Sequence, residues 1–321
     1  MPKLNANLLL TVEGVALWKF DDEVADGHLV HSIKRPIPVS FHREEGVELI
    51  KVDAPTHDHS VVSVLKSNLQ KAFRRSDVGV AVSTTLKLAD VAPGELLRRL
   101  PIIILEDKYG SYQELHDHMA TLLFMMATGH ATSNYRSFLV NLVSHVAGCR
   151  YSPIGWSQKN VEWENSPHVN NLHLRRFYGG MKGDMNMLNW MCVQQSKLPY
   201  KRSPPLREFQ GGEAHLRILP SAIDFHVCPG MVNRIGGTFP NLSQDSIRSA
   251  IWKHSSALRS EREEPEEPEE PKEPKEPKEP KNEIESVWLQ IRDQVLSFQQ
   301  WYIRKVLMPK LHPECHESDA S

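Results

Sequence analysis

Residues 63–107 constrain the fold more than any other stretch, because they hold three consecutive patterns of apolar residues at helical spacing. In the first pattern, Leu65, Leu69 and Phe73 recur every four residues and therefore share one face of a helix. The other side and its edges carry basic residues, namely Lys66, Lys71, Arg74 and Arg75. The pattern predicts an amphipathic helix with a basic outer side.

Two further helices are predicted directly after the first. Asp77 can cap a second helix that runs to about Leu88. Pro93 lies near the first turn of a third helix, where its missing N–H does no harm. Pro101 lies inside that third helix, where it removes a hydrogen bond and predicts a kink or a restart. Short helices with one apolar side and short connections predict an antiparallel helical cluster.

A spaced set of residues runs through this stretch. Leu69-x-Lys71-Ala72-x-Arg74-Arg75-Ser76-Asp77 is followed by Ala81, by Leu97-Arg98-Arg99-Leu100 and by Glu106-Asp107. Over residues 63–129 this set resembles the helical collar domain that follows the ATPase module in the MgsA/RarA group of AAA+ proteins, which are related to the clamp loaders. The resemblance implies an oligomerising protein associated with DNA replication or repair.

The basic pairs of this set are the first candidates for DNA contact. They are Arg74, Arg75, Arg98 and Arg99. The alternative is ion pairing within the fold, with Glu95, Glu106 and Asp107 as partners. The sequence has no G-x-x-x-x-G-K-[ST] loop, so the resemblance implies the collar without its ATPase. With no complete catalytic signature either, we expect a protein that is not an enzyme and needs no cofactor.

Residues 1–55 predict a small β region. Apolar runs at residues 8–12 and 15–20 flank Gly14, and further runs cover residues 39–42 and 47–52. This pattern predicts an antiparallel sheet or hairpin pair, and Pro36 and Pro38 indicate an edge position. We therefore expect a mainly α fold with a small N-terminal β region (α+β), in which residues 56–150 form the collar-like domain and residues 151–260 a mixed helical and strand region continuous with it.

Composition limits the class of protein. The net charge is −2, so bulk electrostatics do not indicate nucleic-acid binding, although local basic clusters can still provide it. The four cysteines form no C-x-x-C pair, which favours free thiols in a reducing compartment. No stretch predicts a secretion signal or a membrane span. We expect an intracellular, soluble protein of the nucleus or the cytoplasm.

A glycine-rich stretch at residues 172–184 is a second candidate for phosphate or nucleic-acid contact. Its glycines would let the backbone approach a ligand, and Arg175, Arg176 and Lys182 would neutralise phosphate. The glycines fit neither a P-loop nor a dinucleotide fingerprint. The alternative is a plain turn, with Asp184 capping a helix from Met185 onward.

Residues 216–227 predict a buried, extended segment that ends in a titratable cluster. Asp224, His226 and Cys228 alternate, so on a strand all three would share one face. This would suit a metal site, or a thiolate with His226 as its base, and so an enzyme as the alternative function. A buried cysteine beside a hydrogen-bonded histidine is the simpler alternative.

The C-terminal part begins with a change in composition. Residues 261–282 repeat proline every third position among Glu and Lys, which predicts a disordered, charged, polyproline-like spacer. Residues 283–309 predict an amphipathic helix with a broad aromatic face, and residues 310–321 a tail. The helix can dock on its own body or on a protein partner, which would make the chain an adaptor. We expect a homo-oligomer, with DNA and such a protein as candidate partners and no membrane contact.

Overall fold

The structure is a computed structural model. It describes residues 5–20, 23–35, 37–52, 58–108, 114–149, 171–195, 202–212, 215–257 and 283–311. The predicted spacer at residues 261–282 and nearly all of the predicted tail lie outside the described residues. Contacts divide the chain into two units, the first with residues 1–56 and 76–215 and the second with residues 57–75 and 216–321.

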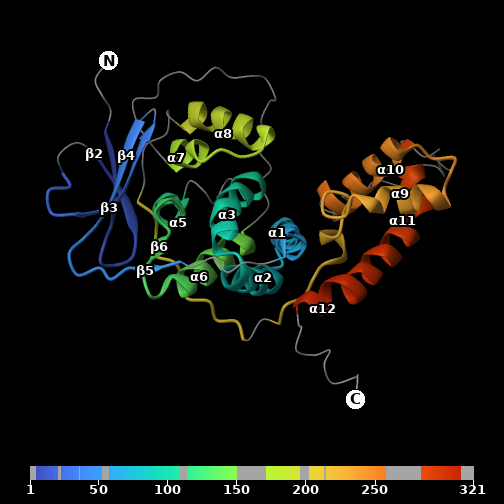
Figure 1. The fold of residues 1–321 in the computed structure, drawn as a ribbon, viewed down its shortest axis with the longest axis horizontal. Helices are drawn as coiled ribbons and strands as arrows, with labels where there is room; N and C mark the ends of the chain where they lie inside the picture. The colour runs from blue at the N-terminus through green and yellow to red at the C-terminus, as the bar shows by residue number, and fades with distance from the viewer. Residues whose placement is uncertain are drawn as a thin grey trace, which may run out of the picture. The chain divides into compact units, whose positions relative to one another are not determined.

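The first unit opens with a four-stranded sheet (Figure 1). Its strands are β1 (Ala6–Leu10), β2 (Ala16–Phe20), β3 (His28–Arg35) and β4 (Ile37–Arg43), in the order β2-β1-β4-β3. The β1–β2 and β3–β4 pairs are antiparallel as expected, whereas β1 and β4 pair in parallel. The expected all-antiparallel sheet is therefore wrong in its central pairing.

The position of Pro38 also corrects an expectation. Pro38 lies on β4, which is an interior strand and not an edge strand. It pairs with Lys34 of β3, but the pairing of β4 with β1 starts one residue later, at Val39. Proline is tolerated at the start of a strand because the ladder on its other side has not yet begun.

One face of this sheet packs on helices. Alternate strand residues such as Leu8, Leu10 and Phe41 are buried against α5 (His116–Thr128) and α7 (Asn171–Phe177). The rings of Phe41 and Phe124 meet edge to face, with centroids 6.2 Å apart. Figure 1 shows α5 and α7 beside the sheet. Buried and partly buried residues alternate along β4, whereas Leu8, Leu9 and Leu10 of β1 are all buried.

The other helices of the first unit are α2 (Val78–Val91), α3 (Pro93–Asp107), α6 (Tyr135–Gly148) and α8 (Lys182–Gln195). Contacts join α2 to α3 and α6, and α3 to α5. α3 continues through Pro101, so the predicted restart is not observed. A two-stranded ladder of β5 (Ile50–Lys51) and β6 (His130–Ala131) completes the unit.

The second unit is built from helices and short helical turns. Its longer helices are α1 (His59–Arg74), α9 (Gly230–Thr238), α10 (Gln244–Ile251) and α11 (Glu283–Tyr302). The short turns are the 3-10 turn η1 (Pro220–Ala222), the π-helical turns η2 (Trp252–Ala257) and η3 (Ile303–Leu307), and α12 (Met308–Leu311). The Asn68 side chain of α1 holds the segment before η1, donating to the carbonyl of Arg217 and accepting from the N–H of Leu219.

The apolar stripe of α11 is used within the second unit. Val287, Ile291, Val295 and Phe298 are buried, and α11 contacts α9, α10 and η1. Gln299 of α11 is also buried and donates to the carbonyl of Ile223 at 2.9 Å. The stripe that residues 283–309 predict thus lies against the chain's own residues.

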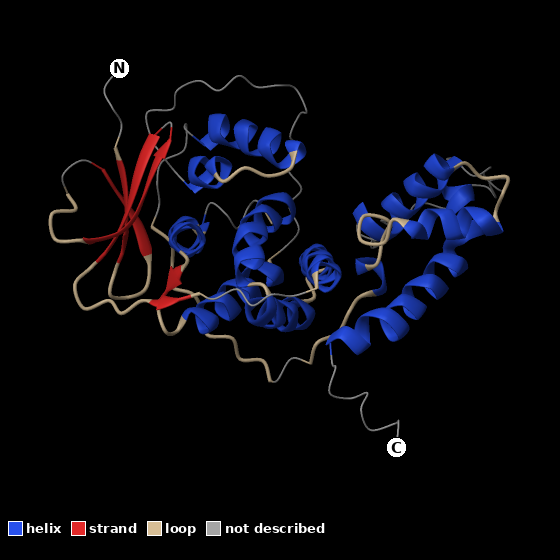
Figure 2. Cartoon of the chain, viewed as in Figure 1, coloured by secondary structure: helices blue, strands red, loops and turns tan. Residues whose placement is uncertain are grey.

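Helices predominate and strands gather near the N-terminus, so the predicted mainly α fold with a small β region is confirmed (Figure 2). No described helix is both long and apolar enough to span a bilayer. The predicted domain boundaries stay predictions, although contacts group α1 with residues 216–321 and apart from α2 and α3.

Candidate functional site

The predicted DNA-contacting residues belong to both units. Arg98 and Arg99 lie on α3, Arg175 and Arg176 on α7, and Lys182 begins α8, all in the first unit. Arg74 ends α1 and Arg75 follows it, in the second unit.

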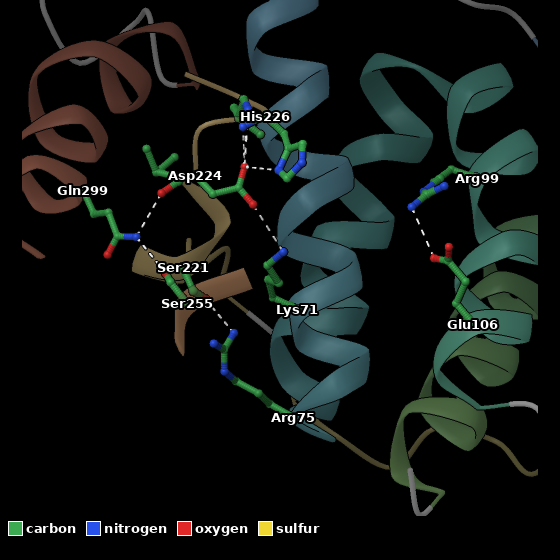
Figure 3. Close-up of polar contacts among 11 residues, drawn as sticks. Lys71, Arg75, Arg99, Glu106, Ser221, Asp224, His226, Ser255 and Gln299 are labelled. Carbon is green, nitrogen blue, oxygen red and sulfur yellow. Dashed lines mark hydrogen bonds and ion pairs between the residues drawn. The ribbon is translucent and has the colours of Figure 1, made fainter. Parts of the chain in front are cut away.

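Two arginines of the first unit are engaged in holding the fold. Arg99 forms an ion pair with Glu106 at 3.4 Å (Figure 3). It also forms an ion pair with Asp184 at 3.4 Å. Arg175 is 5% exposed and donates to the carbonyls of Arg98 and Gly179 at 3.1 and 2.6 Å. Burial lowers the pKa of Arg175, and the Asp184 carboxylate opposes that shift. These contacts give both guanidinium groups structural partners.

The glycine-rich stretch forms the turn between α7 and α8. Gly179 has φ +70°, a conformation that favours glycine. At Gly180, a Cβ would lie 3.1 Å from the methyl carbon of Met185 and close to Asp184. The positive φ thus explains Gly179, and close packing explains Gly180. α8 begins at Lys182, three residues before the predicted start, and Asp184 lies in its first turn.

Arg98 and Lys182 are the exposed basic residues of the predicted set in the first unit, whereas Arg176 is partly buried. Arg98 precedes Arg99 on α3, and Lys182 lies two residues before Asp184, the partner of Arg99. Since Arg99 also contacts Asp184, the two exposed cations extend from neighbouring parts of this unit. They are the residues here best able to meet a phosphate.

In the second unit, Arg75 donates from Nη1 to the Ser221 hydroxyl at 2.6 Å (Figure 3). This bond ties the residue after α1 to η1. Arg74, in the last turn of α1, is partly buried. Arg75 is thus an exposed residue that also holds η1 through one hydrogen bond.

The Ser-Asp step of the resemblance has a structural role as well. Ser76 has φ +52°, and Asp77 caps α2 by accepting from the N–H of Val80 at 3.1 Å. The ammonium group of Lys108, which follows α3 and is fully buried, donates to the Ser76 hydroxyl at 2.9 Å. It also donates to the carbonyls of Ala147 and Cys149 at the end of α6. Lys108 thus ties together the ends of three helices.

Asp224, His226 and Cys228 do not lie on a strand. The chain turns there, because the N–H groups of Val227 and Cys228 both donate to the carbonyl of Asp224, at 3.1 and 2.8 Å. The shared face predicted for the three side chains is therefore wrong. Asp224 is buried and His226 exposed. The physical reason is that η1 and this turn replace the extended segment.

The partner of Asp224 is a lysine that the sequence argument had placed on the outer side of its helix. Lys71 of α1 is 5% exposed, and its Nζ lies 3.5 Å from Asp224 Oδ2 (Figure 3). Asp224 Oδ1 accepts from the N–H of His226 at 2.9 Å and lies 3.3 Å from its Nδ1. Burial lowers the pKa of Lys71 to about 8, and Asp224 opposes that shift. A buried aspartate needs a charged or hydrogen-bonding partner. The prediction that residues 216–227 are buried was therefore the one sequence signal that a basic residue pairs with Asp224.

The thiol and metal interpretations lose their geometric basis. Burial raises the pKa of the Cys228 thiol, which is opposite to what an activated nucleophile needs. Nδ1 of His226 lies against Asp224. Within the described ranges, no group of three or more His, Cys, Asp or Glu side chains could hold a metal ion.

Sequence reasoning missed an open groove of about 690 Å³ in the second unit. Its lining comes from the turn at 225–226, from α10, from the start of η2 and from the start of α11. The lining residues are Phe225, His226, Arg248, Ser249, Trp252, Lys253 and Ile284. An exposed tryptophan between basic residues on one helix was the sequence signal that could have indicated it.

Comparisons with protein-family models, curated proteins and solved structures yield no match to this chain. Its function must therefore be argued from the residues and their geometry.

Proposed function

We propose that the chain is a non-catalytic, oligomerising protein that associates with DNA in replication or repair. The observation that carries the proposal is the spaced residue set of α1–α3, which resembles the collar of the MgsA/RarA group. In support, most residues of this set lie on α1, α2 and α3, and Asp77 of its Ser-Asp step caps α2. The proposal includes no catalytic step. This fits the observation that Asp224, His226 and Cys228 do not share the strand face on which the thiol interpretation depended.

The geometry also narrows which cations would meet DNA in the first unit. Arg99 and Arg175 have structural partners, whereas Arg98 and Lys182 are exposed. Exposed Lys and Arg contact phosphates without sequence preference, and each contact displaces counterions. We therefore assign the phosphate contacts of this unit to Arg98 and Lys182.

The test is binding of the 321-residue chain to a fluorescent single-stranded oligonucleotide and to forked DNA, at about 50 and 200 mM salt. Wild type should bind more weakly at the higher salt. The double variant Arg98→Glu/Lys182→Glu should bind more weakly and lower the slope of log affinity against log salt by about 1 per lost contact. Lys34→Glu, an exposed charge reversal on β3 of the same unit, is the matched control.

Binding that is absent, or that does not change with salt, would contradict the DNA part of the proposal. Equal affinities for wild type and the double variant would contradict the assignment to Arg98 and Lys182. The adaptor alternative has less support, because the apolar stripe of α11 is already buried within the second unit.

A further inference from the structure

The groove of the second unit has an exposed aromatic floor. Trp252 is 47% exposed, although large apolar side chains are usually covered. Its ring meets that of His226 edge to face at 5.5 Å, and His226 lies 4.1 Å from the ring of Phe225. Three neighbouring rings thus offer flat surfaces on which another planar group can stack.

The local backbone places polar groups beside this floor. Arg248 and Ser249 precede Trp252 by four and three residues, so on a helix all three share one face. Lys253 follows directly and also lines the groove. The π-helical turn η2 starts at Trp252. Such turns occur inside helices, frequently at functional sites.

Both cations have carboxylate neighbours, and these contacts are weak. Arg248 lies 3.0 Å from Asp245, whose side chain is 90% exposed. Lys253 lies 3.8 Å from Glu285, which also faces His254 at 3.1 Å. Exposed ion pairs contribute little to stability, so a phosphate can take the place of either carboxylate.

We propose that this groove binds single-stranded nucleic acid, with a base stacked on Trp252 and the backbone phosphates beside Arg248 and Lys253. Aromatic platforms next to basic side chains are how proteins hold single strands without sequence preference. A duplex does not fit this chemistry, because its base faces are already stacked on each other. The inference rests on the proposed DNA association and adds a site outside the collar-like region.

The test measures binding of a short fluorescent oligothymidylate to the 321-residue chain by fluorescence anisotropy. Trp252→Ala should weaken binding by about 5- to 150-fold, the range for loss of one stacked base. Trp252→Phe keeps a stacking surface and should bind nearly as well as wild type. Trp301→Ala is the matched control, because Trp301 is 43% exposed in the same unit but does not line the groove.

A second measurement locates the base directly. Photocrosslinking of the same oligonucleotide carrying 5-iodouracil should label Trp252 or Phe225, as identified by mass spectrometry of the digested chain. Duplex DNA should compete poorly for this crosslink.

The outcomes separate the two proposals. If wild type binds no DNA of any form, the proposed function fails. If it binds but Trp252→Ala is unchanged, or the crosslink lies outside the groove, or duplex competes as well as the single strand, the groove assignment is overturned and DNA association remains.

Discussion

Burial of the Lys71 ammonium group costs solvation energy that Asp224 only partly offsets, and this makes the residue sensitive to pH. The unfolded pKa is 10.5 and the folded pKa about 8. Between these values the unfolded chain holds a proton that the folded chain has released. The free energy of unfolding should therefore rise with pH between about pH 8 and 10.5. Below about pH 8 both states hold the proton, and the stabilisation gained from its release is absent.

The prediction is tested by urea unfolding of wild type and Lys71→Met between pH 8 and 10.5. Relative to the variant, wild type should gain up to about 3 kcal/mol as pH rises, since each pKa unit corresponds to about 1.36 kcal/mol. Taking the difference removes the other groups that titrate there. Lys305→Met, an exposed lysine of the same unit, should show no such trend. If the free energies of unfolding of wild type and Lys71→Met change with pH in the same way, the lowered pKa of a buried Lys71 would be refuted.

At the scale of elements, Lys108 joins the ends of α3 and α6 to the turn before α2. Lys108→Met would keep an apolar stem of similar length but leave the carbonyls of Ala147 and Cys149 without this donor. We expect a loss of about 2–3 kcal/mol in the free energy of unfolding, because hydrogen bonds from charged donors are among the stronger ones. Chemical denaturation measures it. Lys34→Met, at an exposed position of β3 in the same unit, should change stability by less than about 0.5 kcal/mol. A loss as large as that of Lys108→Met would argue against a special role for Lys108.

α11 offers a matched pair of positions two residues apart. Ile291 is fully buried and Leu289 is 54% exposed. Ile291→Ala should destabilise by about 2–5 kcal/mol, whereas Leu289→Ala should cost little, because only the first leaves a cavity. The same denaturation experiment compares them. Similar effects at both positions would mean that the stripe of α11 is not packed on α9 and α10.

Local patterns predicted the helices well and their partners poorly. The period of Leu65, Leu69 and Phe73 correctly indicates the buried face of α1. It cannot show that α1 packs with residues some 150 positions later, because that choice depends on long-range contacts. The parallel pairing of β1 with β4 is hidden for the same reason.

The candidate sites were harder to predict, for an electrostatic reason. Arg-Arg pairs look alike in sequence whether they face solvent or a carboxylate. Only the fold shows that Arg99 meets Asp184, which lies 85 positions away, and that Arg175 is buried. The turn at Asp224–Cys228 was missed because alternation alone cannot distinguish a strand from a turn with a buried first residue.

At the scale of the whole molecule, the chain consists of two units, and the residue set of the collar resemblance extends over both. α1 contributes to one unit and α2 and α3 to the other. Assembly through α1–α3 would therefore involve both units. Under this proposal, Arg98 and Lys182 of the first unit and the Trp252 groove of the second unit would each contact DNA.

The most direct test of an oligomeric, DNA-associated protein is light scattering of the 321-residue chain, alone and with single-stranded DNA, at about 50 and 200 mM salt. The proposal predicts one defined multiple of the chain mass at both salt concentrations, and a further mass increase with DNA that shrinks at the higher salt. A monomer whose mass does not change when DNA is added would contradict it.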